Sequence, residues 1–262
     1  LINVIFMAEN LAYVEEGNGK SVILLHGFCE NKAIWQQLMS ELSPRARLLA
    51  PDLPGFGENT AIHGDMSIDN MAEQIAAWMD EQTIASAPII GHSLGGYVAL
   101  ALADRFPEKV SRLCLFHSTA QADSQEKQRK RDQTIKFLEA NGVATFVKNF
   151  IPSLFAPAKR EHMKSTIDEV IALAAQTPDA TAIAVTRAMR DRPERLEVLK
   201  KAAFPCLFIA GREDSAVPYE DMKQQSQLPA QAQLITLENC GHMGMYENPE
   251  DSREALYAFI SS

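Results

Sequence analysis

The residues whose types and spacing most clearly indicate a reaction are Gly-His-Ser-Leu-Gly at positions 91–95. An apolar run at residues 87–90 precedes them, and an alanine-rich stretch with helical spacing follows them. A serine at the tip of a strand-to-helix turn adopts strained backbone angles, and glycines two places before and after it avoid a clash. The pattern therefore predicts a nucleophilic hydroxyl on Ser93. The Leu94 N–H, which opens the helix, points to where a negative oxygen would develop.

A serine hydroxyl needs a base that removes its proton. The chain has six histidines, and His242 differs from the others because it follows the last predicted strand on a glycine-flanked loop. It is therefore the predicted general base. A structural role is favoured for the other five histidines, which are His26, His63, His92, His117 and His162.

An imidazole base needs a carboxylate that fixes its tautomer. Asp214 follows a predicted strand and precedes His242, which gives the chain order serine, aspartate, histidine. Glu213 is the neighbour most easily confused with it, and Asp123 is a weaker alternative. Asp52 also ends a strand, but the Pro-Gly-Phe-Gly turn beside it favours a carboxylate that braces a loop.

A second donor for a negative oxygen is expected from the loop after the first central strand, where His26-Gly27-Phe28 stands. The Phe28 N–H is the predicted donor, and its ring would help to wall a pocket. The alternative is that His26-Gly27 is only a turn. Apolar side chains that would suit an acyl group, or would equally serve as ordinary core packing, are Phe28, Met243, Phe146, Phe150 and Phe155.

Strand-like and helical patterns alternate along most of the chain, which predicts a mostly parallel central sheet flanked by helices, with ligands at the carboxyl ends of the strands. Residues 3–7 and 11–15 predict an N-terminal hairpin. The later predicted strands are 21–25, 47–50, 87–90, 113–116, 205–210 and 232–237, and the helices between and after them are 32–42, 67–83, 97–105, 219–225 and 249–260.

Strand-like runs vanish between residues 119 and 203. Amphipathic helices are predicted there over 123–140, 143–150, 157–175 and 179–190. The expected core therefore consists of residues 1–118 and 204–262. The basic side chains Lys127, Arg129, Lys130 and Arg131 read as a solvated helix face.

Composition limits the classes of partner. Of 262 residues, 46% are apolar, so a sizeable core is expected. A net charge of −9 disfavours nucleic acid and anionic membranes. No signal peptide or spanning segment is predicted. The four cysteines have neither a disulfide nor a metal-ligand spacing. A cytoplasmic location is expected, and no metal or organic cofactor is needed.

Together these stretches resemble the α/β-hydrolase fold family from end to end, at residues 26–28, 52–57, 91–96, 211–214 and 241–242. The resemblance implies a serine triad and a helical cap at 119–203 where substrate preference is decided. Ser93 stands where dehalogenases and epoxide hydrolases of this fold carry aspartate, and Cys29-Glu30 departs from the His-Gly-Gly-Pro-Gly stretch of proline iminopeptidases.

The expected reaction is hydrolysis of a small or medium carboxylic ester through an acyl-enzyme, with the ester and water as partners. The resemblance leaves other activities open on the same triad. These are lactone, thioester or C–C bond hydrolysis, and a slow-turnover ligand receptor.

Overall fold

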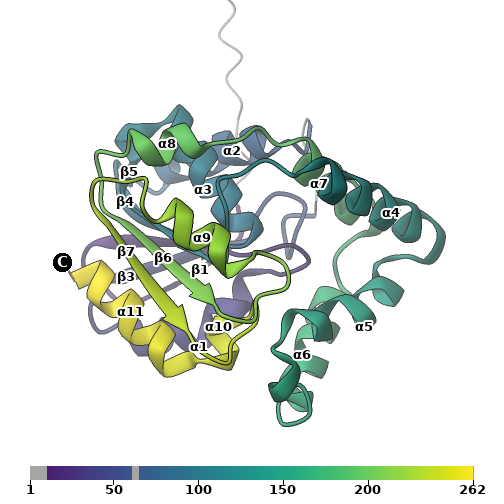
Figure 1. The fold of residues 1–262 in the computed structure, drawn as a ribbon. Helices are drawn as coiled ribbons and strands as arrows, with labels where there is room; N and C mark the ends of the chain where they lie inside the picture. Colours follow the sequence, from purple (N-terminus) through teal and green to yellow (C-terminus); the bar gives the residue numbers. More distant parts are fainter. Residues whose placement is uncertain (1–10, 61–64, 262) are drawn as a thin grey trace, which may run out of the picture.

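The computed structural model describes residues 11–60 and 65–261. Seven strands form one sheet in the order β1-β3-β2-β4-β5-β6-β7 (Figure 1). Among them β1 alone pairs antiparallel, with β3, so the prediction of a mostly parallel sheet is confirmed. The strands are β1 (Tyr13–Glu16), β2 (Ser21–Leu25), β3 (Arg47–Pro51), β4 (Ala87–His92), β5 (Val110–Phe116), β6 (Cys206–Gly211) and β7 (Ala232–Leu237).

One arm of the predicted N-terminal hairpin lies among the described residues. Its first arm, residues 3–7, lies outside the described residues. Its second arm overlaps β1, whose Tyr13 pairs with Pro51 of β3. The central strands β2, β4 and β6 are buried along nearly their whole length. Continuous apolar runs suit such positions, because helices cover both faces of a parallel sheet.

Helices cover the sheet on both sides (Figure 1). On one side lie α2 (Ile68–Glu81), α3 (Leu94–Arg105) and α8 (Leu196–Lys200), and on the other lie α1 (Gln36–Leu42), which follows the 3-10 turn η1 (Lys32–Trp35), and α11 (Pro249–Ser261). The Ser67 side chain caps α2 by accepting the Asn70 N–H at 3.1 Å. The shorter elements are η2 (Pro107–Lys109), α9 (Tyr219–Gln225) and α10 (Gly244–Glu247).

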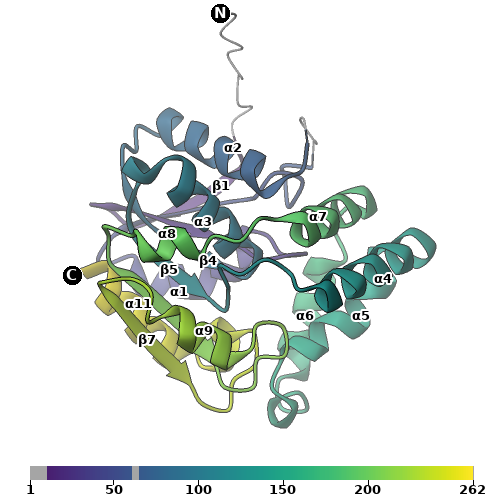
Figure 2. The same ribbon diagram turned by 45° about the horizontal axis from the view of Figure 1, so that its top comes forward.

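Helices also fill the chain between β5 and β6, and α4 to α7 lie together to the right of the sheet in both views (Figures 1 and 2). They are α4 (Gln125–Asn141), α5 (Val143–Leu154), η3 (Pro157–Lys159), α6 (Lys164–Ala174) and α7 (Asp179–Asp191). The short α8 follows them but packs against α3 of the core. We call α4–α7 with η3 the insertion.

Two helix boundaries in the insertion differ from expectation. A continuous helix over 157–175 is wrong, because the chain makes the turn η3 at Pro157 and begins α6 only at Lys164. Lys159 holds that turn by donating to the Glu247 carbonyl and to Asn248 Oδ1, both at 2.6 Å. Helix α5 runs four residues beyond the predicted end and takes Pro152 into its last turn.

No helix in the described ranges has the length and apolarity that crossing a membrane requires.

Candidate active site

Ser93 occupies a sharp turn between β4 and α3. Its φ and ψ of 50° and −111° lie in a strained region, and its N–H donates to the Phe116 carbonyl at 3.0 Å. A Cβ on Gly91 would lie 2.4 Å from the Gly95 carbonyl oxygen, and one on Gly95 would lie 2.2 Å from the Leu25 carbonyl oxygen. Only glycine fits either position, so the turn has the backbone that the sequence pattern predicts. The Ser93 side chain is partly exposed.

Asp214 and His242 meet at the carboxyl edge of the sheet. Asp214 follows β6, His242 lies in the loop after β7, and His242 Nδ1 is 2.8 Å from Asp214 Oδ2. The other carboxylate oxygen, Oδ1, accepts the N–H groups of Ala216 at 2.8 Å and Val217 at 2.9 Å. These bonds fix the carboxylate and leave His242 Nε2 as the free ring nitrogen. This is the contact that a base and its orienting acid require.

A second imidazole shares the same oxygen, because His117 Nδ1 lies 3.0 Å from Asp214 Oδ2. Burial alone would raise the pKa of Asp214, but the two imidazoles His242 and His117 hold it well below its usual range. Burial lowers the pKa of His117 from 6.5 to about 4, so that ring is neutral near pH 7. A neutral ring that carries its proton on Nδ1 donates to Asp214 and leaves the buried Nε2 without a partner.

No hydrogen bond joins the Ser93 hydroxyl to any group in the described ranges. The His242 ring lies 5.0 Å, centroid to centroid, from the ring of His92, the residue before Ser93. Catalytic hydrogen bonds are often long in enzymes without substrate and tighten in the complex.

Glu30 and His92 form a buried pair directly below this edge. Their side chains are almost fully buried, and His92 Nδ1 lies 3.0 Å from Glu30 Oε2. The same oxygen accepts the Gly27 N–H at 2.5 Å, and the other ring nitrogen of His92, Nε2, faces the His242 carbonyl at 3.0 Å. We refer to Glu30 and His92 as the Glu30–His92 pair.

Glu247 holds the His242 loop from the opposite side. Its buried carboxylate accepts the N–H groups of Gly241 at 3.0 Å, Met243 at 3.1 Å and Ala156 at 2.8 Å. The last of these belongs to the insertion. The N–H of His242 itself donates to the Leu154 carbonyl of α5 at 2.6 Å. The main chain around His242 is thus bonded to the end of α5.

The two expected oxyanion donors lie at adjacent positions of this edge. Phe28 follows β2 and Leu94 begins α3, and neither N–H donates to a residue that the structure describes. The preceding His26 ring is bonded on both nitrogens, since Nε2 accepts the Leu53 N–H at 2.8 Å and Nδ1 donates to the Gly27 carbonyl at 2.9 Å. Free N–H groups of this kind are what an oxyanion hole needs.

Three of the five expected pocket residues form an aromatic cluster. The Phe28 ring lies 6.4 Å from that of Phe146 and 6.1 Å from that of Phe150, and the two α5 rings stack at 4.8 Å. The insertion therefore places an apolar wall over the loop that carries the Phe28 N–H. Phe155 and Met243 are fully buried.

The alternative acids have other partners. Asp52 braces its loop by accepting the Lys32 ammonium at 2.5 Å and the Glu58 N–H at 2.9 Å. Asp123 pairs with Arg192 at 2.8 Å and with Arg131 at 3.1 Å, and Glu213 is exposed. Among the histidines, His162 is exposed and His63 lies outside the described residues.

One group of side chains in the described ranges has metal-ligand geometry, and it coincides with the acid–base cluster. Ligand atoms of His117, Asp214 and His242 lie within 4.8 Å of one another. Both ring Nδ1 atoms lie within hydrogen-bond distance of Asp214 Oδ2, and His117 Nδ1 also lies 3.3 Å from the Gly211 nitrogen. Hydrogen bonding accounts for this cluster.

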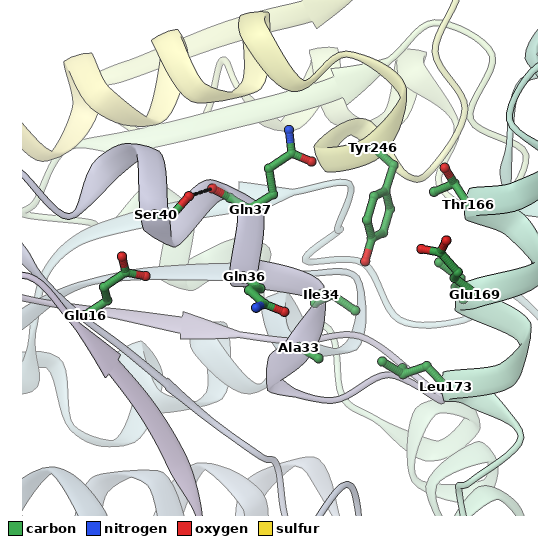
Figure 3. A pocket seen from close by; sticks show the side chains of 11 residues that line it. Glu16, Ala33, Ile34, Gln36, Gln37, Ser40, Thr166, Glu169, Leu173 and Tyr246 are labelled. Atoms are coloured by element: carbon green, nitrogen blue, oxygen red, sulfur yellow. Dashed lines mark hydrogen bonds between the residues drawn. The ribbon is translucent and has the colours of Figure 1, made fainter.

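A separate pocket of 590 Å³ opens between the α1 edge of the core and α6 of the insertion (Figure 3). Its lining includes Ile34, Gln37, Glu169, Leu173 and Tyr246, and none of the predicted site residues. Burial, together with the Glu30 and Glu169 carboxylates, raises the pKa of the Tyr246 phenol, which is therefore neutral.

Comparison with known proteins agrees with this architecture. A family model described as alpha/beta hydrolase fold matches residues 20–249. The pimeloyl-[acyl-carrier protein] methyl ester esterase of Photobacterium profundum is 30% identical over 260 residues, which cover 97% of this chain and 100% of the relative. The chain belongs to the α/β-hydrolase fold family.

Two solved structures have the same fold. A thermophilic esterase from Thermogutta terrifontis matches with a TM-score of 0.90 at 27% identity, covering 95% of this chain and 92% of that one. An enol-lactonase from Burkholderia xenovorans LB400 matches with a TM-score of 0.89 at 21% identity, covering 96% of each chain.

Two residues at this edge, Glu30 and Glu247, were given no role in the sequence, and His117 was given only a structural one. Glu30 stands three residues after Gly27, and His117 ends a strand beside the one that carries Ser93, so both positions hinted at a place near the site. The contacts themselves span 62 residues for Glu30–His92 and 97 residues for His117–Asp214. Patterns in a short stretch of sequence do not indicate contacts over such separations.

Proposed function

We propose that the protein is a serine hydrolase in which Ser93 is the nucleophile, His242 the general base and Asp214 the orienting acid. The observation that carries the proposal is the 2.8 Å bond between His242 Nδ1 and Asp214 Oδ2, at the edge where the Ser93 elbow presents a partly exposed hydroxyl. The membership of the chain in the α/β-hydrolase family supports the same assignment.

The proposed reaction has two steps. The Ser93 hydroxyl attacks the ester carbonyl while His242 Nε2 takes its proton, and the N–H groups of Phe28 and Leu94 hold the oxyanion. The alcohol leaves with the proton from His242, which gives an acyl-enzyme on Ser93. Water, activated by His242, then cleaves the acyl group, and the proton returns to Ser93. Atoms balance with ester and water alone, so no cofactor enters the scheme.

The proposed substrate is a small or medium carboxylic ester. The aromatic cluster of Phe28, Phe146 and Phe150 offers an apolar wall for an acyl chain. The named activities of the Photobacterium relative and the Thermogutta structure, both esterases, support ester substrates over thioesters and C–C bonds. The substrate region of the proposed cap, residues 119–203, includes Phe146 and Phe150.

The direct test is turnover of p-nitrophenyl acetate by the wild type, Ser93→Ala and the control Ser40→Ala, an exposed serine on α1. Ser93→Ala should lose about 10⁴-fold or more in kcat, while Ser40→Ala keeps the wild-type rate. An unchanged rate in Ser93→Ala would remove Ser93 from the mechanism.

Panels of esters, thioesters and lactones then rank the substrate classes. A burst with negligible steady-state turnover, together with a ligand-dependent thermal shift, would support a receptor instead.

We also propose that the protein works in a reducing compartment such as the cytoplasm. Its four cysteines are all free and buried, and burial raises the pKa of the Cys206 thiol to about 12. Four thiols should titrate after denaturation of protein purified without reductant. Fewer than four would count against this setting.

A further inference from the structure

The chemistry of the His92 ring follows from its two neighbours. Nδ1 faces the Glu30 carboxylate at 3.0 Å, and Nε2 faces the His242 carbonyl at 3.0 Å. The His242 carbonyl is an acceptor and Glu30 Oε2 also accepts the Gly27 N–H, so an ionised Glu30 requires a proton on both ring nitrogens of His92. The imidazole is therefore the cation of a buried ion pair, and the Glu30 carboxylate is its anion.

The titration behaviour of the two groups agrees with this geometry. Burial alone would lower the pKa of His92, but Glu30 and the His242 carbonyl raise it above its ordinary value. Burial would raise the pKa of Glu30, and His92 together with the Gly27 N–H lowers it instead. The other titratable groups that face the pair are His26, Cys29 and Tyr246 around Glu30, and Asp214, His117 and His242 around His92.

The pair joins three segments that the proposed reaction needs in register. His92 directly precedes Ser93 at the elbow, and its ring bonds the main-chain carbonyl of His242. Glu30 bonds the Gly27 N–H, one residue before the proposed donor Phe28. A Cβ on Gly27 would lie 2.7 Å from Glu30 Oε2, so the carboxylate packs directly on that peptide.

We propose that Glu30 and His92 are positioning residues that hold nucleophile, base and oxyanion donor in one geometry. This inference rests on the proposed function. Asp214 orients the side chain of His242 but makes no bond to its main chain, whereas His92 bonds that main chain from the elbow itself. A displacement of about 1 Å at a reacting group costs about 100-fold in rate, so a link of this kind acts on kcat.

The test compares the kinetics of wild type, Glu30→Gln, His92→Gln and the double variant on p-nitrophenyl acetate. A glutamine at position 30 can accept the Gly27 N–H but has no charge to hold the imidazolium. Each single variant should lose about 10- to 100-fold in kcat with KM within about threefold. The double variant should be no worse than the more severe single one, because both break the same link.

Met79→Ala in α2 is the matched control for lost stability. Met79 is fully buried and lies away from the sheet edge that carries the site. It should lower the melting temperature and leave kcat near the wild-type value. If Glu30→Gln and His92→Gln fold and keep the wild-type kcat, the inference is overturned while the proposed function stands. If the wild type itself shows no Ser93-dependent turnover, the proposed function fails first and the inference with it.

A second measurement needs no variant to fold. In the nitrogen-15 spectrum of wild-type protein labelled with nitrogen-15 and carbon-13, the His92 ring should show two protonated nitrogens at pH 7. A neutral His92 ring would overturn the ion pair, whatever the kinetics. Loss of one ring proton in Glu30→Gln, together with the fall in kcat, would support it fully.

Discussion

The carboxyl edge of the sheet and the insertion above it are held together by different means. At the edge, the buried carboxylates of Asp214 and Glu247 each accept bonds from neighbouring residues and from a distant part of the chain. In the insertion, many ion pairs are exposed, as between Arg187 and Glu139 or Lys164 and Asp168. Exposed pairs contribute little to stability. Buried hydrogen bonds therefore fix the side chains at the edge. In the insertion, apolar contacts such as the Phe146–Phe150 stack stabilise the packing of the helices instead.

The largest expected effect lies at the edge. Asp214→Asn removes the charge that orients His242 and favours the wrong tautomer, so kcat on p-nitrophenyl acetate should fall about 10⁴-fold. Glu213→Gln, one residue away and exposed, is the matched control and should stay near the wild-type rate. Equal losses in the two variants would contradict the assignment of Asp214.

A glycine-to-alanine substitution should lower the free energy of unfolding more at the edge than in the insertion. A Cβ on Gly95 would meet the Leu25 carbonyl at 2.2 Å with no side chain to yield, so Gly95→Ala should cost about 3 kcal/mol or prevent folding. Gly142→Ala in the insertion meets only the Asp179 side chain, at 3.3 Å, but has a φ of 73°. It should cost about 1 kcal/mol in chemical denaturation. A Gly142 variant as unstable as the Gly95 variant would erase the contrast.

The pH dependence of stability should report on His117. Its pKa is about 4 in the folded protein against 6.5 ordinarily. Between those values the unfolded chain binds the proton more readily, so stability present above pH 6.5 is lost as the pH falls towards 4, by up to about 3 kcal/mol. The raised pKa of His92 acts in the opposite sense. The measurement is therefore the free energy of urea unfolding of the wild type minus that of His117→Asn, plotted against pH. Two curves that run parallel between pH 4 and 6.5 would contradict the prediction.

The smallest effect belongs to the insertion. Phe146→Ala removes part of the aromatic cluster and should raise KM for a p-nitrophenyl ester of medium chain length about fivefold, with kcat little changed. Leu173→Ala, which lines the separate pocket of Figure 3, is the control and should leave KM unaltered. The reverse result would place the acyl chain in that pocket.

Local signals predict much of the fold and of the edge. The six later strands were predicted close to their observed positions, because their apolar runs are continuous and end in turn residues. Asp214 and His242 were expected at one edge because each follows a strand and parallel strands bring their carboxyl ends together, and the structure places their side chains 2.8 Å apart. Their catalytic roles stay a prediction. The short helices α8 and α10, of five and four residues, were missed because they hold too few turns for a periodic pattern.

Contacts between residues far apart in the chain could not be predicted from the sequence. Glu30 and Glu247 look like ordinary acidic residues in the sequence, and only the fold buries them against partners 62 and 91 residues away. The break at residues 160–163 was missed for the same reason, because Lys159 is held by the C-terminal part of the chain.

The Glu247 carboxylate has a mechanical consequence. Since it bonds Ala156 as well as Gly241 and Met243, the end of α5 cannot lift away while the residues around the imidazole stay still. A movement of this end of α5 that admits a bulky ester would therefore also displace the main chain around His242, the proposed proton acceptor. The buried Glu247 carboxylate in this way couples the opening of the insertion to the position of His242.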